Sequence, residues 1–341
     1  MREFTTDPIQ TLSKSTTHQN GCRQANRRQK WLWLPFFTIL FAMCSCAEQQ
    51  PTQTPNRFAL ITADKMIPAR DDHPPILHHD GWYQPEPINN QINSAGLEDS
   101  AFITPDGTML FFFFTPNADI SAAEQVNDGV TGICLSENHA GKWEAPTLVQ
   151  LSKSNQPVLD GCPFYDGKTL WFCSIREGNF RPIDFWTAER ENGKKWVNIR
   201  NAGKQLNKDF QIGEMHGSLD GTTLFFHRVT VNQGMDLWQT YLQSDQWAEP
   251  TEIQMLNSSA DDSRPALSPD ESELWFTRTF KGTPAIFRSI RQESGWSAPE
   301  LIISQFAGEP SIDAIGNIYF THHFYKDGSM LEADIYIARK K

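Results

Sequence analysis

The stretch DGWYQPEPI, residues 80–88, contains a Trp-x-x-Pro pattern that returns in KWEAP (142–146), QWAEP (246–250) and GWSAP (295–299). At the three later places the pattern ends a repeat of short apolar strands. At Trp82 it stands ahead of the first complete repeat. Such a fragment is expected when a ring of repeats is closed by its own N-terminal strand.

Five lines of the sequence share one layout: an acidic residue, a short apolar strand, an Asp-Gly-like turn and an aromatic strand. The lines, called units one to five, begin EDSAFITPDGTMLFFFF (98–114), LDGCPFYDGKTLWFCS (159–174), GEMHGSLDGTTLFFHR (213–228), DDSRPALSPDESELWFTR (261–278) and GEPSIDAIGNIYFTHH (308–323). A third strand follows each line, and a fourth, with the tryptophan, follows only the first four. The sequence therefore predicts an all-β fold: a five-bladed β-propeller of four-stranded antiparallel blades, closed by the strand around Trp82.

The repeat resembles that of TolB-like (WD40-like) propellers, in which a Pro-Asp-Gly turn precedes a Leu-Tyr-Phe strand and an Asp-Ile-Tyr strand follows. The matching residues are Pro105-Asp106-Gly107 with Leu110, Pro269-Asp270 with Leu274, and Asp334-Ile335-Tyr336. The resemblance covers about residues 75–341 and implies the fold, but no single function, because these propellers serve many roles. Five units in place of six, and no room for a further N-terminal domain, separate the chain from TolB itself.

The N-terminal segment is typical of an export signal. Basic residues between Arg23 and Lys30 precede the apolar run WLWLPFFTILFAM (31–43). MCSC (43–46) resembles the lipobox of bacterial lipoproteins, which would make Cys46 the lipidated first residue. Ordinary cleavage and a signal anchor are the alternatives.

These features divide the chain into three parts. We expect an export signal over residues 1–45, a polar, flexible tether over 46–74 and a single propeller domain over 75–341. The expected location is the cell envelope, as an outer-membrane lipoprotein or in the periplasm.

Acidic side chains outnumber basic ones. The formal net charge is −11, and removal of residues 1–45, with six basic and two acidic side chains, makes it −15. Nucleic acid is a poor partner for a domain with this negative charge, and we expect contact with the membrane through the lipid anchor only. We expect a monomer.

Three cysteines follow Cys46. If residues 166–169 form the turn of a hairpin, Cys162 faces Cys173 at a separation suited to a disulfide. Two buried thiols are the alternative, because a register slip of one residue would part the side chains.

Strand direction places the start of each first strand, the end of each second strand and the start of each third strand on one face of the disc. First strands bring the carboxylates of Glu98, Asp99, Asp160, Glu214, Asp262 and Glu309 to this face, and second strands bring Arg176, Arg228, Arg278 and His322. These ten residues are the candidate ligand-binding set of an acidic central face.

The charges have two interpretations. Pairs such as Arg176 with Asp184 and Arg228 with Asp236 can tie strands together without touching a ligand. The innermost carboxylates repel one another, which raises their pKa values unless a cation or cationic ligand lies among them. We expect no cofactor and no dedicated metal site, apart from a cation that the acidic channel could hold.

Two functions follow from this face. The first is a non-catalytic binding or scaffold module for a protein, peptide or glycan. The second is a carbohydrate-active hydrolase or lyase, with Asp99, Asp160 and Glu214 as acid, base or pKa modulator. A narrow channel whose acids are all tied to arginine or backbone N–H favours the first. Two carboxylates lining a ligand-sized pocket favour the second.

Overall fold

The computed structural model describes residues 57–117, 119–153, 156–193, 195–230 and 234–341, and strands dominate these ranges. The helical turns are η2 (Arg57–Leu60), η3 (Pro68–Arg70), α1 (Ala122–Gln125) and the π-helix η4 (Gln205–Phe210). No helix in the described ranges has the length and apolar character needed to cross a membrane. The predicted export signal and Cys46 lie outside the described residues, and the all-β prediction is confirmed.

Units two, three and four each form one antiparallel sheet. Unit two contains β8 (Leu159–Tyr165), β9 (Thr169–Ile175), β10 (Asp184–Glu191) and β11 (Lys195–Asn201). Unit three contains β12 (Met215–Gly217), β13 (Thr223–Thr230), β14 (Gly234–Gln243), β15 (Gln246–Trp247) and β16 (Thr251–Glu252). Unit four contains β17 (Asp262–Leu267), β18 (Glu273–Phe280), β19 (Thr283–Gln292), β20 (Gly295–Trp296) and β21 (Glu300–Ser304), with β1 (Ile76–Leu77) added beside β21.

Units one and five share the remaining sheet. Unit one contains β3 (Leu97–Ile103), β4 (Met109–Thr115), β5 (Gly132–His139), β6 (Lys142–Trp143) and β7 (Thr147–Leu148). Unit five contains β22 (Ala307–Ile312), β23 (Ile318–Lys326) and β24 (Ser329–Ala338), with β2 (Glu86–Pro87) beside β24. A single parallel pair, Ala333 with Leu97, joins the two units.

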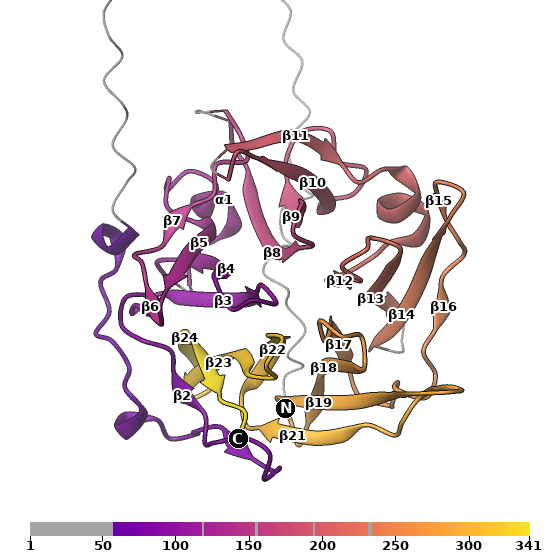
Figure 1. The fold of residues 1–341 in the computed structure, drawn as a ribbon. Helices are drawn as coiled ribbons and strands as arrows, with labels where there is room; N and C mark the ends of the chain where they lie inside the picture. The colour runs from indigo at the N-terminus through magenta and orange to yellow at the C-terminus, as the bar shows by residue number, and fades with distance from the viewer. Residues whose placement is uncertain (1–56, 118, 154–155, 194, 231–233) are drawn as a thin grey trace, which may run out of the picture.

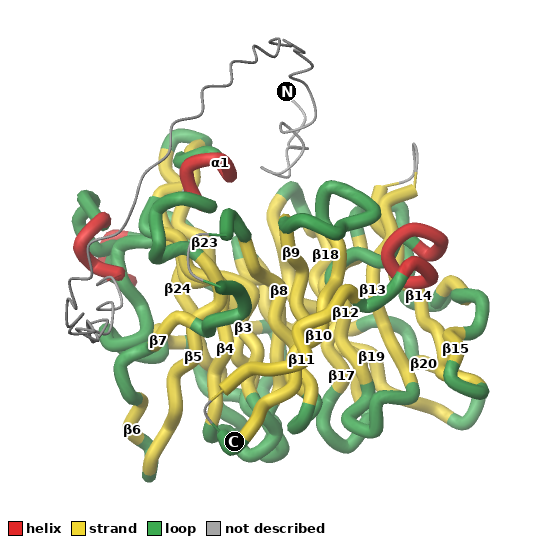
Figure 2. The backbone as a smooth tube through the Cα atoms, turned by 90° about the horizontal axis from the view of Figure 1, so that it is seen from above, coloured by secondary structure: helices red, strands yellow, loops and turns green. Residues whose placement is uncertain are grey.

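The first strands of the units contact one another in a ring, in the order β3, β8, β12, β17 and β22. The sheets radiate from this ring in Figure 1, and Figure 2 shows their strands running between two loop-bearing sides. This is a propeller-type arrangement, in which neighbouring sheets cover one another.

The second strand of unit one, β4, is buried on both sides. Phe111, Phe112 and Phe114 of β4 each have 0 % exposure. Because successive side chains of a strand point to opposite faces of the sheet, both faces of β4 are covered. This explains the continuous apolar runs, since a sheet with one solvated face would alternate apolar and polar residues.

The Asp of the repeated turn holds the hairpin between the first and second strands. Thr104 Oγ1 donates to Asp106 Oδ1 at 2.6 Å, and the Thr108 N–H donates to the same oxygen at 3.0 Å. Equivalent bonds recur around Asp220 and Asp270. The repeated Asp is therefore explained by turn geometry.

The segment around Trp82 lies along the last strand, as expected. β2 pairs antiparallel with β24, and Trp82 forms a further bridge with Lys340. The Trp82 side chain is 1 % exposed, and its Nε1 donates to the Gly316 carbonyl at 2.8 Å. Because β1 of the same segment pairs with β21, this segment joins units four and five.

Residues 57–74 differ from the flexible tether that we expected there. This segment, called the N-terminal strap, supplies counter-charges to buried side chains of units one and five. Its bonds join Arg57 to Glu98 (3.2 Å), Lys65 to Asp334 (2.6 Å) and Asp71 to His322 (2.8 Å). Its polar composition predicted a tether, because composition does not reveal partners that lie far away in the sequence.

Candidate functional site

Five residues on or next to the first strands surround a central cavity of about 50 Å³. These residues, called the central ring, are Ser100, Cys162, Glu214, Arg264 and Glu309. Two of them, Glu214 and Glu309, belong to the set predicted from the sequence.

β-bulges direct the side chains of the central ring. In units one, two, four and five the register between the first and second strands shifts at this point. The φ angle is positive at Ser100 (50°), Cys162 (50°), Arg264 (51°) and Glu309 (57°). A bulge inserts an extra residue and re-aims its side chain, so simple alternation along the strand does not predict which residues reach the cavity.

Arg264 connects the two acids of the central ring. Its Nε lies 2.6 Å from Glu309 Oε1 and 3.3 Å from Glu214 Oε1. Glu309 also accepts from the Ser100 N–H at 2.6 Å. Burial and, to a lesser extent, the negative charge of Asp99 raise the pKa of Glu309 to about 7, against the opposing charge of Arg264.

Asp99 and His323 lie next to Glu309 of the central ring, and the three side chains offer ligand atoms within 4.8 Å of one another. His323 Nε2 is 3.7 Å from Asp99 Oδ1. Burial lowers the pKa of His323 to about 4, so its ring is neutral near pH 7. Two carboxylates and a neutral imidazole are suitable ligands for a divalent cation. A second group of possible ligands consists of Glu137 and His139 of β5 and Glu144, which directly follows β6.

The structure does not bring Glu98, Asp160 and Asp262 into the cavity. They lie two residues before the central ring and are 0 %, 7 % and 0 % exposed. Their partners are Arg57 for Glu98, Arg176 for Asp160 and Arg278 for Asp262. Burial raises the pKa of Glu98 to about 7, although Arg57 acts against this shift. These acids link strands and the strap.

The predicted basic residues are also held within the fold. Arg176 pairs with Asp160 and not with the expected Asp184, which instead accepts from the Phe180 N–H at 2.6 Å. Arg228 lies opposite Asp236 in the strand register, and its guanidinium lies 4.7 Å from the centroid of the Trp238 ring. His322 is 0 % exposed and bonded to Asp71.

Three ring residues, Ser100, Cys162 and Arg264, lie outside the set predicted from the sequence, and Arg264 is the charged one among them. A signal for it exists, because Cys162, Arg264 and Glu309 are each followed by proline. The three Xaa-Pro pairs stand at the same point of their units. Proline cannot donate to a strand ladder and is tolerated at bulges. A recurring Xaa-Pro near the start of a first strand therefore marks the ring position.

Cys162 and Cys173 are joined by a disulfide, with a Cα–Cα distance of 5.5 Å. The register pairs Cys173 with Gly161, so Cys162 is the extra residue of the bulge. Cys134 is a buried free thiol. The disulfide fixes the first strand of unit two at the wall of the cavity.

No family model matches the chain, and no curated protein matches it. Among solved structures it is similar to TolB from Acinetobacter baumannii, with a TM-score of 0.38 and 16 % identity over 68 % of this chain and 50 % of that chain. It is similar to a thermostable family-43 glycoside hydrolase (TM-score 0.49, 12 % identity, 73 % of this chain and 91 % of that chain). It is also similar to the catalytic domain of Coprinopsis cinerea GH62 alpha-L-arabinofuranosidase (TM-score 0.45, 10 % identity, 81 % of this chain and 98 % of that chain). The chain thus spans half the length of the TolB structure, and these values assign it no function.

The raised pKa of Glu309 predicts a pH-dependent stability. Its contribution is complete below pH 4.5, the ordinary pKa of the carboxyl, and is lost as the pH rises through about 7, because the unfolded chain ionises more readily. Glu309→Gln has no such loss. Its free energy of unfolding relative to wild type should therefore rise by about 2–3 kcal/mol between pH 4.5 and 8.

Urea unfolding at several pH values measures this difference. Glu249→Gln, at an exposed carboxylate, is the control and should show little change. A difference between Glu309→Gln and wild type that stays constant over this pH range would contradict the prediction.

Proposed function

We propose that the chain is an exported five-bladed β-propeller that acts as a non-catalytic binding or scaffold module through its acidic central face. The blades correspond to units one to five, and the Trp82 segment supplies the outer strand of the fifth. The ring of first strands and the pairing of β2 with β24 support this proposal.

The observation that carries the proposal is the pairing of the carboxylates around the channel. Glu98, Asp160 and Asp262 are buried, and each is bonded to an arginine. Glu214 and Glu309 share Arg264, and the cavity that they line is about 50 Å³. Small-molecule sites usually measure about 300–1,000 Å³, so the space between the acids is too small for a sugar ring.

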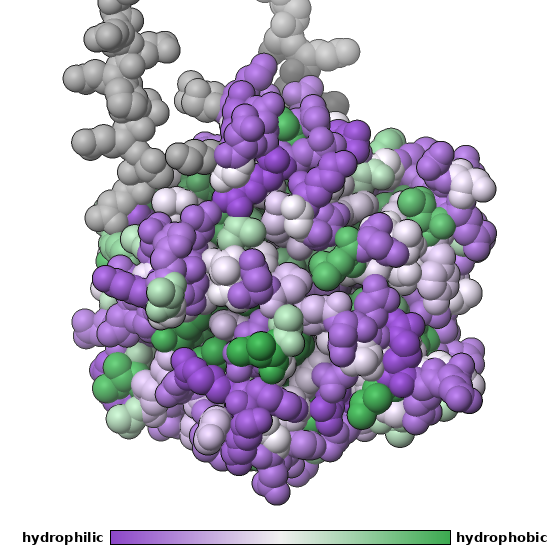
Figure 3. Space-filling view, in the orientation of Figure 1, coloured by the Kyte–Doolittle hydropathy of each residue, from purple (hydrophilic) through white to green (hydrophobic). Residues whose placement is uncertain are grey.

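The location and partners belong to the same proposal. We place the protein in the cell envelope, lipidated at Cys46 in the outer membrane or free in the periplasm. Its ligand on the central face is a protein, peptide or glycan, and Asp99, Glu309 and His323 are where a cation would bind. On the side shown in Figure 3 hydrophilic residues predominate and apolar ones are scattered, which supports a monomer.

One observation favours a carbohydrate-active hydrolase or lyase as the second candidate. Glu309 has a pKa of about 7, and Asp99 lies beside it. A protonated acid about 5 Å from an ionised carboxylate is the arrangement of retaining glycosidases. The bond from Arg264 and the small cavity weigh against this reading.

A comparison of wild type with an Asp99→Asn, Glu309→Gln double variant separates the two functions. For a binding module, both proteins should release reducing ends from neutral and acidic polysaccharides at the same background rate between pH 4 and 8. A wild-type rate about a hundredfold or more above that of the variant would establish the hydrolase instead. Titration with Mn²⁺, followed by electron paramagnetic resonance, tests cation binding: wild type should take up one ion more than the variant, which keeps the second group of possible ligands.

A further inference from the structure

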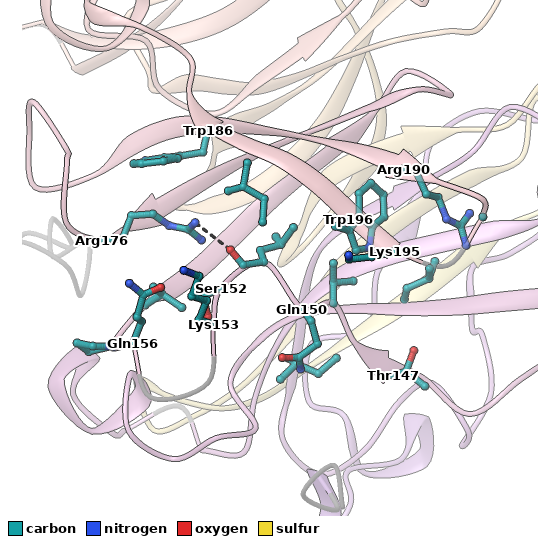
Figure 4. A pocket seen from close by; sticks show the side chains of 18 of the residues that line it. Thr147, Gln150, Ser152, Lys153, Gln156, Arg176, Trp186, Arg190, Lys195 and Trp196 are labelled. Atoms are coloured by element: carbon teal, nitrogen blue, oxygen red, sulfur yellow. Dashed lines mark hydrogen bonds between the residues drawn. The ribbon is translucent and has the colours of Figure 1, made fainter. Parts of the chain in front are cut away.

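A cleft of about 1130 Å³ lies between units one and two, and its lining includes none of the central-ring residues. One wall is formed by β5 with residues 147–153 and 156–158, and the other by β10 and β11 (Figure 4). Leu135, Leu151, Val158 and Ile199 give it an aliphatic lining. A cleft of this size accommodates an oligosaccharide-sized ligand.

Two half-buried tryptophans of unit two line the cleft, and contacts with neighbouring side chains fix the position of each ring. Trp186 Nε1 donates to Asn179 Oδ1 at 2.8 Å, and its ring lies 4.9 Å from the Arg176 guanidinium. The Trp196 ring meets Tyr165 edge-on at 5.8 Å. Rigid, partly exposed indoles offer apolar surface at a low cost in conformational entropy.

Unit three offers a comparison for Trp186. Trp238 in unit three is the counterpart of Trp186, and the Arg228 guanidinium lies over its ring at 4.7 Å. Trp238 is half-buried too, but it does not line the cleft. It therefore provides a matched control for Trp186.

The charges of the cleft differ in whether they are already paired. The cations are Lys153, Arg176, Arg190 and Lys195, and the carboxylates are Glu137, Glu144 and Glu177. Arg190 bonds to Glu137 at 2.9 Å, and Arg176 bonds to Asp160 and to the Leu151 carbonyl. Figure 4 marks the second of the Arg176 bonds.

Two lysines of the cleft are not paired with any carboxylate that the structure describes. Lys153 and Lys195 are exposed, come from opposite walls, and form no ion pair with any residue that the structure describes. Among the lining carboxylates, Glu177 forms no ion pair with a described residue, and Glu144 lies 3.5 Å from His139, which offsets its charge only when the imidazole is protonated. In a chain of net charge −11, a cleft with two unpaired lysines favours an anionic ligand.

We propose that this cleft binds an acidic oligosaccharide. Sugar rings pack on Trp186 and Trp196, and carboxylate or sulfate groups meet Lys153 and Lys195. The site is separate from the central face, so its failure would leave the proposed function of that face intact.

The test uses the full chain and calorimetric titration with three probes: a uronic-acid tetramer, a neutral glucose tetramer and a fatty acid. Wild type should bind the uronic-acid tetramer. Trp186→Ala should weaken this binding about tenfold or more, whereas Trp238→Ala should leave it unchanged. The Lys153→Ala, Lys195→Ala double variant should weaken it about tenfold, and Lys142→Ala, Lys281→Ala should not.

The lysine variants change exposed side chains, so they keep the test valid if Trp186→Ala fails to fold. No binding of the uronic-acid tetramer at millimolar concentration would overturn the proposal. Equal affinity for the neutral tetramer, displacement of the uronic-acid tetramer by the fatty acid, or unchanged binding by the lysine variant would overturn it as well.

Discussion

Replacement of Trp82 by alanine is expected to lower the free energy of unfolding by about 3–5 kcal/mol, the usual range for removal of a buried aromatic side chain. Trp82 is 1 % exposed, and its ring meets that of Trp275 edge-on at 5.7 Å. Lys340 Nζ lies 3.8 Å from the ring centroid. Because the Trp82 segment joins units four and five, the variant also loosens that junction. Urea unfolding followed by circular dichroism measures the loss.

Trp247→Ala is the matched control. Trp247 holds the same position in the Trp-x-x-Pro pattern of unit three, but it is only half-buried and lies within a continuous unit. Its loss should cost about 1–2 kcal/mol. If the two variants were equally destabilised, Trp82 would have no special part in joining the ends of the fold.

Arg57→Ala is expected to cost about 3–5 kcal/mol, because it leaves a buried carboxylate without its counter-charge. Arg57 is 8 % exposed and Glu98 is 0 % exposed. The guanidinium also donates to the carbonyls of Gln91 at 3.0 Å and Ile92 at 2.6 Å, and it lies 5.0 Å from the Phe114 ring centroid. Thermal and urea unfolding of the full chain measure the effect.

Two further variants test whether the unpaired charge of Glu98 causes the loss of stability in Arg57→Ala. Glu98→Gln in the Arg57→Ala background removes the unpaired charge and should recover part of the loss. Arg339→Ala breaks an exposed pair with Glu86 and should cost less than about 1 kcal/mol. A cost for Arg57→Ala as small as that for Arg339→Ala would show that the strap is not needed for stability.

The repeat and the place of Trp82 could be predicted because local chemistry produces them. Asp106 and its counterparts are required by a turn, and aromatic runs are required by sheets that are covered on both sides. The segment around Trp82 lies along the last strand, as the unmatched pattern predicted. Such patterns depend on residues that are close in the sequence.

The site was less predictable, because it depends on bulges and distant contacts. Strand direction placed Asp160 and Asp262 at the channel, but the bulges give that place to Cys162 and Arg264. Arg57 lies 41 residues before Glu98, and no local pattern connects a single arginine with an acid so far away.

The strap also limits how far the propeller can lie from a bilayer. If Cys46 carries the proposed lipid, only residues 47–56 separate the anchor from Arg57, and an extended chain of that length reaches about 35 Å. An unattached segment up to residue 74 would reach about 100 Å. Units one and five would then be held near the lipid headgroups, and partners would be limited to molecules embedded in that leaflet or lying close against it.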